Sequence, residues 1–493
     1  MGIEIDQVEF SEQDFGAFSA SLEENLNALY QLLERPGFGQ GSGSLGAELE
    51  MYLVDDAGFP LYANQKVLEE ANDPSLTLEL NRYNLEFNLP PFGLAEQPFA
   101  STEQAIIERL ESLRQAAARH GGRVVPIGIL PTLRDSDFGA HCITDRRRYH
   151  ALVQQLIRRR GDHFNIDING EEPLKMAMKD ITLEGANTSF QVHYRVTPDA
   201  FAETFNAIQL MTPLALAIGA NSPGIFGHAL WDETRIPLFK QSIDTRHVDP
   251  YGWNEPARVS FGQGWARLGA EELFREVVRI YPPLLPVCNS TTAAEEMAAG
   301  NIPSLAELRM HQSTVWLWNR PIYDDADGGH LRIEMRALPA GPSAVDMVAN
   351  AAFLIGAAEG IRPVINQLLP AIPFRNAEYN FYRAAQHGFD ARLVWPELDQ
   401  AGYREQPIVD IIQRMLPVAR AGLESIGLPP SETDRYLGVI EERLEKRQSG
   451  AVWQRKKLAQ LKRQMSSREA AHAMLESFIE NSVANLPVSR WTL

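Results

Sequence analysis

Residues 45–54 form the most constraining stretch of the sequence, because apolar and charged residues alternate there. Leu49 and Met51 alternate with Glu48 and Glu50. Side chains of a β-strand point to opposite faces with a period of two, so the two glutamates stand on one face, roughly 6.5–7 Å apart. The pattern predicts a strand with one apolar face and one face that carries adjacent carboxylates.

Three later segments, 76–91, 187–196 and 330–338, repeat this alternation. The first of them changes its apolar phase, which predicts a turn or bulge around residues 81–84. The polar positions of the three segments carry Glu79, Asn81, Glu86, Asn88, Ser189, Gln191, His193, Arg195, His330, Arg332, Glu334 and Arg336.

No lysine occurs at these polar positions, although lysine is common on solvated sheet faces. Any one of the strands, and His193 taken alone, would be interpreted as structural or solvent-facing. Four strands with the same restricted set instead indicate a functional interior face. Carboxylates and an imidazole are ligands for hard cations, and arginine binds carboxylate or phosphate through paired hydrogen bonds. Together they are typical of a phosphoryl-transfer site with several Mg²⁺ ions.

The remaining pattern is mostly helical, which predicts an α+β fold. Helical spacing or capping signals occur at 16–35, 101–119, 146–160, 200–220 and 343–360, and most of the chain after residue 400 reads as helix. Residues 124–130 form a continuous apolar run that predicts a buried strand. The strands lie within the first 340 residues and do not alternate regularly with helices, which favours α+β over α/β.

Composition excludes several classes of function. The net charge of −18 over 493 residues argues against nucleic-acid binding, which needs a basic surface. No signal peptide is visible, the apolar runs are too short for a membrane span, and the chain has only two cysteines, so a cytoplasmic location without a membrane partner is expected. Phosphate-loop, H-E-x-x-H and G-x-S-x-G motifs do not occur.

Several short segments resemble, in their order, the glutamate–cysteine ligase type 2 family of carboxylate–amine ligases, which is related in fold to glutamine synthetase. The segments are Gly46-Ala-Glu-Leu-Glu50, the pair Glu79 and Glu86, Gln191-Val-His193, Ala220-Asn-Ser-Pro223 with Arg235, Trp318-Asn-Arg320 and Arg332-Ile-Glu-Met-Arg336. Arg146-Arg-Arg-Tyr149 resembles the family's R-Y element. The resemblance implies a curved antiparallel sheet that forms a funnel flanked by helices, as in glutamine synthetase and the guanidino kinases. It also implies a helical lead-in over residues 1–44, a catalytic core over 45–400 and a C-terminal helical segment over 401–493.

The resemblance further implies the roles of individual residues. The implied Mg²⁺ ligands are Glu48, Glu50, Glu79, Glu86, His193 and Glu334. Arg235 and Arg336 would act in catalysis by holding phosphate or a substrate carboxylate, and the implied substrate-binding residues are Arg148, Tyr149, Asn221, Gln191 and Arg332. ATP with two or three Mg²⁺ ions, or Mn²⁺ in their place, would serve to join glutamate to an amine such as cysteine, the first step of glutathione synthesis.

Two features leave the function open. Some relatives carry H-x-H where this chain has Gln191-Val-His193, which leaves one imidazole and a different metal set. No residue matches a pocket for the thiol of cysteine, so ligation to another amine, a guanidino or amine kinase activity and a catalytically silent binding role remain alternatives. The sequence does not specify the oligomeric state.

Overall fold

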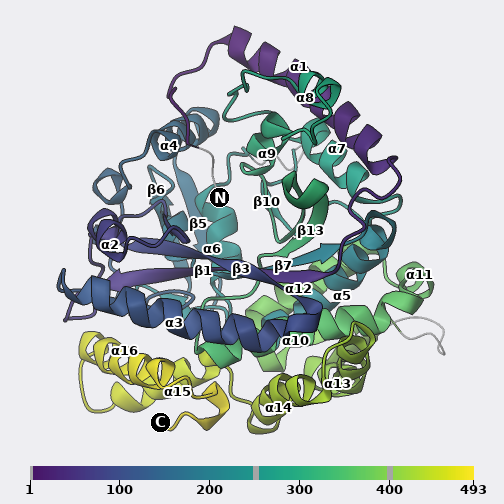
Figure 1. Ribbon diagram of the computed structural model, residues 1–493. Coiled ribbons are helices and arrows are strands. Elements are labelled where there is room, and N and C mark those ends of the chain that lie inside the picture. Colours follow the sequence, from purple (N-terminus) through teal and green to yellow (C-terminus); the bar gives the residue numbers. More distant parts are fainter. Residues whose placement is uncertain (1–3, 248–254, 397–403) are drawn as a thin grey trace.

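The core of the protein is a seven-stranded antiparallel sheet, seen in a computed structural model that describes residues 4–247, 255–396 and 404–493. The strand order is β12-β13-β7-β1-β3-β2, and β4 pairs with β1 beyond this path. The strands are β1 (Ser44–Val54), β2 (Leu76–Leu78), β3 (Asn84–Gly93), β4 (Arg123–Val125), β7 (Phe190–Val196), β12 (Asn319–Asp324) and β13 (His330–Met335). The sheet curls, so that one face is concave (Figure 1).

The register of the sheet brings the polar positions of the four predicted strands onto one face. Glu48 of β1 lies opposite Gln191 of β7, and Glu50 lies opposite Glu86 of β3. His193 of β7 lies opposite Glu334 of β13. Since side chains alternate along each strand, these pairs form a continuous polar surface across the sheet.

The apolar face of the sheet packs against three long helices, α3 (Pro98–Ala118), α5 (Phe201–Gly219) and α10 (Ala344–Ile361). They lie below the sheet in Figure 1. The hydroxyl of Tyr194 on β7 donates a hydrogen bond of 3.0 Å to Glu359 on α10. The stretches Pro198–Gly219 and Ala344–Ala371 are long and apolar enough to cross a membrane by length and composition. However, 89% and 94% of the residues in the apolar window of each stretch are buried inside the protein. They therefore form the predicted core helices.

Further helices surround the concave face (Figure 1). The helices on this side and around its edges are α1 (Glu12–Leu33), α2 (Asn64–Ala71), α4 (Arg147–Arg160), α6 (Arg235–Ser242), α7 (Ala270–Ile280), α8 (Ala293–Ala298) and α9 (Ala306–Gln312). The small two-stranded sheets are β5 (Phe164–Ile168) with β6 (Leu174–Met178), β8 (Gly224–Ile225) with β9 (His228–Ala229), β10 (Val259–Ser260) with β11 (Trp316–Leu317), and β14 (Arg392–Trp395) with β15 (Arg404–Pro407).

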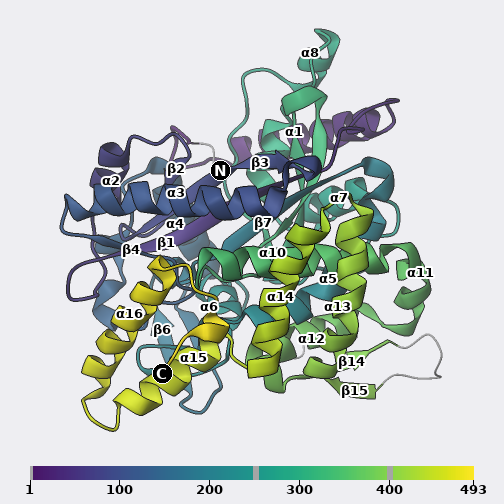
Figure 2. The ribbon, with the colours of Figure 1, turned by 60° about the horizontal axis from the view of Figure 1, so that its bottom comes forward.

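The C-terminal helices lie on the far side of the helical layer from the sheet (Figure 2). The remaining helices are α11 (Ile365–Leu368), α12 (Phe374–His387), α13 (Ile408–Ser425), α14 (Pro430–Lys446), α15 (Gly450–Leu461) and α16 (Ser467–Val483). Arg443 of α14 forms a fully buried ion pair of 2.8 Å with Asp346 of α10, which ties this segment to the core. The predicted division at residue 400 lies outside the described residues, and the three-part division stays a prediction.

Most predicted elements are confirmed, and two are corrected. The turn predicted at residues 81–84 is the link that turns β2 back onto β3. The helix predicted from Ser101 begins at Pro98, because a proline at the first helical position needs no hydrogen-bonding N–H. The strand predicted over 124–130 pairs only at Arg123–Val125, because Pro126 has no N–H to donate to a ladder.

The close packing of α10 against α13 depends on glycine, which generates a stability prediction. A β-carbon on Gly422 would lie 2.0 Å from the carbonyl oxygen of Gly356, whereas one on Gly438 of α14 would meet nothing within 4 Å. We expect Gly422→Ala to lower the free energy of unfolding by about 1–3 kcal/mol or more through overpacking. Gly438→Ala, the matched control, should raise it by about 0.5–1 kcal/mol. Urea denaturation measures both, and equal effects would contradict the packing described here.

Candidate metal and substrate site

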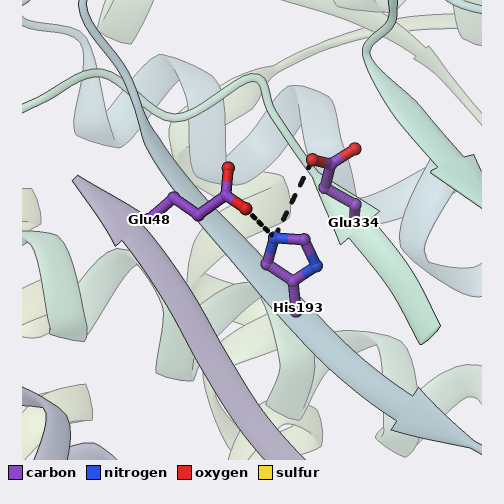
Figure 3. A group of neighbouring side chains, drawn as sticks. All are labelled: Glu48, His193 and Glu334. Atoms are coloured by element: carbon purple, nitrogen blue, oxygen red, sulfur yellow. Dashed lines mark ion pairs between the residues drawn. The ribbon is translucent and has the colours of Figure 1, made fainter. Parts of the chain in front are cut away.

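Two groups of metal-ligand side chains lie on the concave face of the sheet. The first comprises Glu48, His193 and Glu334, which we call the histidine group, and its ligand atoms lie within 4.8 Å of one another. Nε2 of His193 is 3.1 Å from Oε1 of Glu48 and 3.8 Å from Oε1 of Glu334. Figure 3 shows the three side chains converging from β1, β7 and β13.

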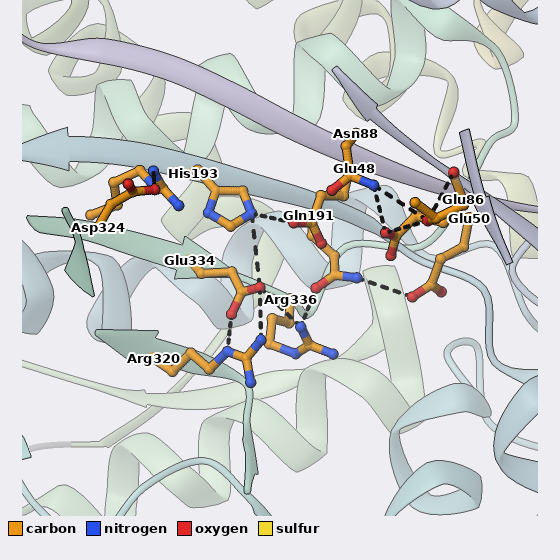
Figure 4. A network of polar contacts seen from close by, with 12 residues as sticks. Glu48, Glu50, Glu86, Asn88, Gln191, His193, Arg320, Asp324, Glu334 and Arg336 are labelled. Atoms are coloured by element: carbon orange, nitrogen blue, oxygen red, sulfur yellow. Dashed lines mark hydrogen bonds and ion pairs between the residues drawn. The ribbon is translucent and has the colours of Figure 1, made fainter. Parts of the chain in front are cut away.

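The second group comprises Glu50, Glu79 and Glu86, which we call the carboxylate group. Its ligand atoms also lie within 4.8 Å of one another. Gln191 Nε2 donates a hydrogen bond of 3.0 Å to Glu50, and the backbone N–H of Ser189 donates one of 2.6 Å to the same carboxylate. The two groups are adjacent because β1, with its period of two, contributes Glu48 to one and Glu50 to the other (Figure 4).

Two arginines hold the histidine group on the side of β13. Arg320 of β12 and Arg336, which follows β13, both contact Glu334, and Arg336 Nη1 donates a hydrogen bond of 3.0 Å to Glu334 Oε1. Arg336 also donates to the side-chain oxygen of Gln191. Gln191 therefore bridges the two groups, since its amide nitrogen binds Glu50 and its amide oxygen binds Arg336 (Figure 4).

The two groups differ in their electrostatics. Burial favours the neutral form of Glu48, but the charge of His193 outweighs it and lowers the pKa of Glu48 to about 2. Burial opposes ionisation of Glu334 as well, yet Arg320 and Arg336 hold its pKa well below its ordinary value. Both carboxylates of the histidine group are therefore ionised at neutral pH.

The carboxylate group is less well compensated by positive charge, because burial outweighs the cations near it. Burial, together with the charge of Glu48, raises the pKa of Glu86 to about 8. Burial and the charges of Glu86 and Glu50 raise the pKa of Glu79 well above its ordinary value. Burial also raises the pKa of Glu50, although Arg336 opposes the shift. Three like charges in one buried place need a cation to ionise together.

The side chains fit divalent metal ions of the Mg²⁺ class. Five carboxylates and one imidazole supply mainly hard oxygen ligands, which Mg²⁺ and Mn²⁺ prefer. The pKa values of Glu79 and Glu86 are raised because burial and like charges disfavour the ionised forms, which a bound cation would stabilise. The two groups thus have the donor chemistry for cations, and Glu48 and Glu50 would bind different ions.

A cavity of about 380 Å³ opens on this face. Its acidic lining includes Glu48 and all three members of the carboxylate group, and its basic lining comprises Arg146, Arg148, Arg320 and Arg336. Tyr149, Leu152, Leu156, Ile243 and Trp316 supply apolar walls. A pocket in which charged side chains converge between apolar walls has the character of a small-molecule site.

Only some of the residues predicted to act in catalysis or substrate binding line this cavity. Gln191, Arg148, Tyr149 and Arg336 line it. Arg148 donates a hydrogen bond of 2.8 Å to Ser313, and the hydroxyl of Tyr149 donates one of 2.6 Å to the carbonyl of Leu78.

Three other predicted residues lie outside its lining. Arg332 pairs with Asp324 at 2.7 Å. Arg235 is buried, pairs with Glu233 and donates to the carbonyl of Ala337. Asn221 donates to the carbonyl of Ala340 and accepts a hydrogen bond from Gln454 of α15. Arg235 and Asn221 therefore fix the chain that follows Arg336, and their contact with substrate stays a prediction.

Arg320 and Glu184 lie at the site but are not among the predicted site residues. Arg320 lies opposite Glu334 in the β12–β13 register, and its place in the Trp318-Asn-Arg320 segment was a usable signal. Glu184 lines the cavity from a short 3₁₀ helix, η4 (Thr182–Ala186), and burial with the charge of Glu50 raises its pKa to about 8. No periodic pattern marks a single turn of this kind.

Solved structures with the same fold are ligases. Glutamate–cysteine ligase from Francisella tularensis, solved in complex with AMP, superposes with a TM-score of 0.52 over 91% of this chain and 90% of its own, at 12% identity. A bifunctional glutathione synthetase from Pasteurella multocida gives the same score over 94% of this chain and 55% of its own, at 11% identity. These likenesses show the fold.

The sequence comparisons show the family. The model of glutamate-cysteine ligase family 2 matches residues 44–478, so the chain belongs to this family. Curated glutamate–cysteine ligases of Haloquadratum walsbyi and Halobacterium salinarum are each 26% identical, over 189 and 191 residues respectively. The matched stretch covers 37% of this chain and 44% of each relative, which is less than half of their length.

The electrostatics of the carboxylate group predict how Mg²⁺ affects stability. In protein treated with a chelator, stability should fall as pH rises from about 4.5 to about 8, because Glu86 binds its proton more tightly in the folded chain than in the unfolded one. Mg²⁺ binds the ionised form, so the rise in Tm caused by Mg²⁺ should be larger near pH 8 than near pH 6.

Scanning calorimetry with chelator and with Mg²⁺ measures this difference. Glu86→Gln should reduce the pH dependence, part of which remains because the pKa values of Glu79 and Glu184 are raised as well. Glu108→Gln, an exposed control on α3, should leave it unchanged. An identical Mg²⁺ effect at both pH values would contradict the assignment.

Proposed function

We propose that this protein is an ATP-dependent carboxylate–amine ligase that forms a γ-glutamyl amide through an acyl phosphate. The observation that carries the proposal is the adjacency of the histidine and carboxylate groups on one sheet face, beside Arg320 and Arg336. Membership in glutamate-cysteine ligase family 2 supports the same chemistry.

The proposed reaction has two steps. An oxygen of the glutamate γ-carboxylate attacks the γ-phosphorus of ATP, so that a C–O–P linkage forms and ADP leaves. The nitrogen of a neutral amine then attacks the acyl carbon, and the C–O bond breaks as inorganic phosphate leaves. Activation is needed because hydroxide is a poor leaving group and phosphate is a good one.

The residues of the chain contribute position and charge. Glu48, His193 and Glu334 would hold one Mg²⁺ ion and Glu50, Glu79 and Glu86 another, and the bound ions would screen the phosphate charge. Arg336, locked by Glu334 and Gln191, presents a fixed positive charge at the cavity wall. Glu79 follows β2, and because the other ligands stand on paired strands, their relative positions are held rigidly.

Cysteine is the acceptor that we propose first, since the named relatives are glutamate–cysteine ligases. The cavity itself favours a small molecule with a carboxylate, because Arg146 and Arg148 line the wall formed by α4 and the residue before it. Other small amines fit the same description, and the choice among them is a matter for the experiment below.

Removing one carboxylate from the histidine group tests the metal assignment. We expect Glu48→Gln and Glu334→Gln each to reduce Mg²⁺-dependent ADP formation by about 10²–10³-fold or more, since each removes a cation ligand next to the phosphate. Circular dichroism should show an intact fold, and Glu108→Gln should keep full activity. Full activity in both site variants would refute the proposed role of this sheet face.

The acceptor is identified by measuring ADP release with glutamate, ATP and a panel of amines that includes L-cysteine. A true acceptor should raise the rate and yield equal amounts of ADP, phosphate and amide. A stable phosphorylated product without free phosphate would instead indicate a kinase, and no ADP with any amine would indicate a binding protein.

A further inference from the structure

Glu184 is a carboxylate of the cavity that belongs to neither metal group, and it is less exposed than Glu4, the other such residue of the lining. It lies on η4, directly before β7, and lines the same cavity as Glu50, Glu79 and Glu86. Within the described residues, its carboxylate makes no hydrogen bond and no ion pair. The five carboxylates of the metal groups each have at least one such contact.

The backbone around Glu184 is held firmly, so its position is a built feature of the site. Asn81 donates a hydrogen bond of 2.9 Å to the carbonyl of Thr182, at the start of η4. Asn187 donates one of 2.9 Å to the carbonyl of Glu184 itself. A β-carbon on Gly185 would lie 2.2 Å from the side chain of Asn81, so only glycine allows this close approach.

The neighbours of Glu184 define the part of the cavity that it faces. Glu79, Glu86 and Tyr149 line the same cavity as Glu184. Ile181, from the turn before η4, and Leu152 of α4 add apolar walls to the cavity. The region therefore combines apolar surroundings with a carboxyl group that has no hydrogen-bond or ion-pair partner among the described residues, and a bound cation would favour its ionised form.

We propose that Glu184 binds the ammonium group of the acceptor amine and positions it beside the carboxylate group. This inference rests on the proposed function, in which glutamate and ATP are held by the two metal groups. An ammonium group needs an anionic partner, and Glu184 is the less exposed of the two lining carboxylates that belong to neither metal group.

The same geometry restricts the class of acceptor. Arg146, Arg148, Arg320 and Arg336 line the cavity and would repel a second positive charge on the substrate. The acceptor is therefore a compound with a single ammonium group, such as an α-amino acid, and polyamines are poor acceptors.

The test compares a charged and an uncharged nucleophile. Glu184→Gln keeps the size of the side chain and removes its charge. With glutamate and Mg-ATP, its KM for L-cysteine should rise roughly 10- to 100-fold. Its KM for hydroxylamine, which is uncharged at neutral pH, should stay within about threefold of the wild-type value. Glu184→Asp should restore part of the affinity for L-cysteine, and Glu171→Gln, an exposed control, should change neither KM.

Other outcomes overturn the inference. Equal losses with both nucleophiles, together with a smaller Mg²⁺ effect on Tm, would make Glu184 a further metal ligand. An unchanged KM for L-cysteine would exclude it from acceptor binding. Absence of glutamate-dependent ADP formation with either nucleophile in the wild-type protein would refute the proposed function itself, independently of Glu184.

Discussion

The burial of carboxylates on one face of a curled sheet is the constraint on which the rest of the structure depends. Removing an ionised carboxylate from water costs several kcal/mol unless a counter-charge is near. Arg320 and Arg336 supply such counter-charges to the histidine group, whereas burial outweighs the cations near the carboxylate group. The pKa values of Glu48 and Glu86 accordingly shift in opposite directions. A site built in this way has a place for added positive charge.

The architecture makes this arrangement stable by dividing the tasks between the two faces of the sheet. On one face, α3, α5 and α10 bury the apolar positions of the strands, which offsets part of the cost of the polar face. On the other face, cross-strand register sets the separations between the ligands that stand on strands, whereas Glu79 lies in the link between β2 and β3. Buried pairs such as Arg443 with Asp346 anchor the C-terminal helices to the same helical layer, far from the cavity.

Alternation with a period of two was sufficient to predict the four strands and their shared polar face, because burial of one face imposes that period. The pairing of β1 with β7 and of β7 with β13 could not be predicted in this way, since register is a long-range property. The grouping of Glu48 with Glu334, and of Glu50 with Glu86, therefore emerged only in three dimensions. Glu184 escaped prediction because one 3₁₀ turn has no periodicity, and Arg235 and Asn221 proved to hold backbone carbonyls outside the cavity lining.

The most direct test of the central claim follows the oxygen atoms of glutamate. The protein is incubated with ATP, an accepted amine and glutamate labelled with ¹⁸O in its γ-carboxylate, and the released inorganic phosphate is analysed by mass spectrometry. The acyl-phosphate route predicts one labelled oxygen in each phosphate, because the C–O bond of the activated carboxylate breaks when the amide forms. Unlabelled phosphate released along with amide product would contradict this account.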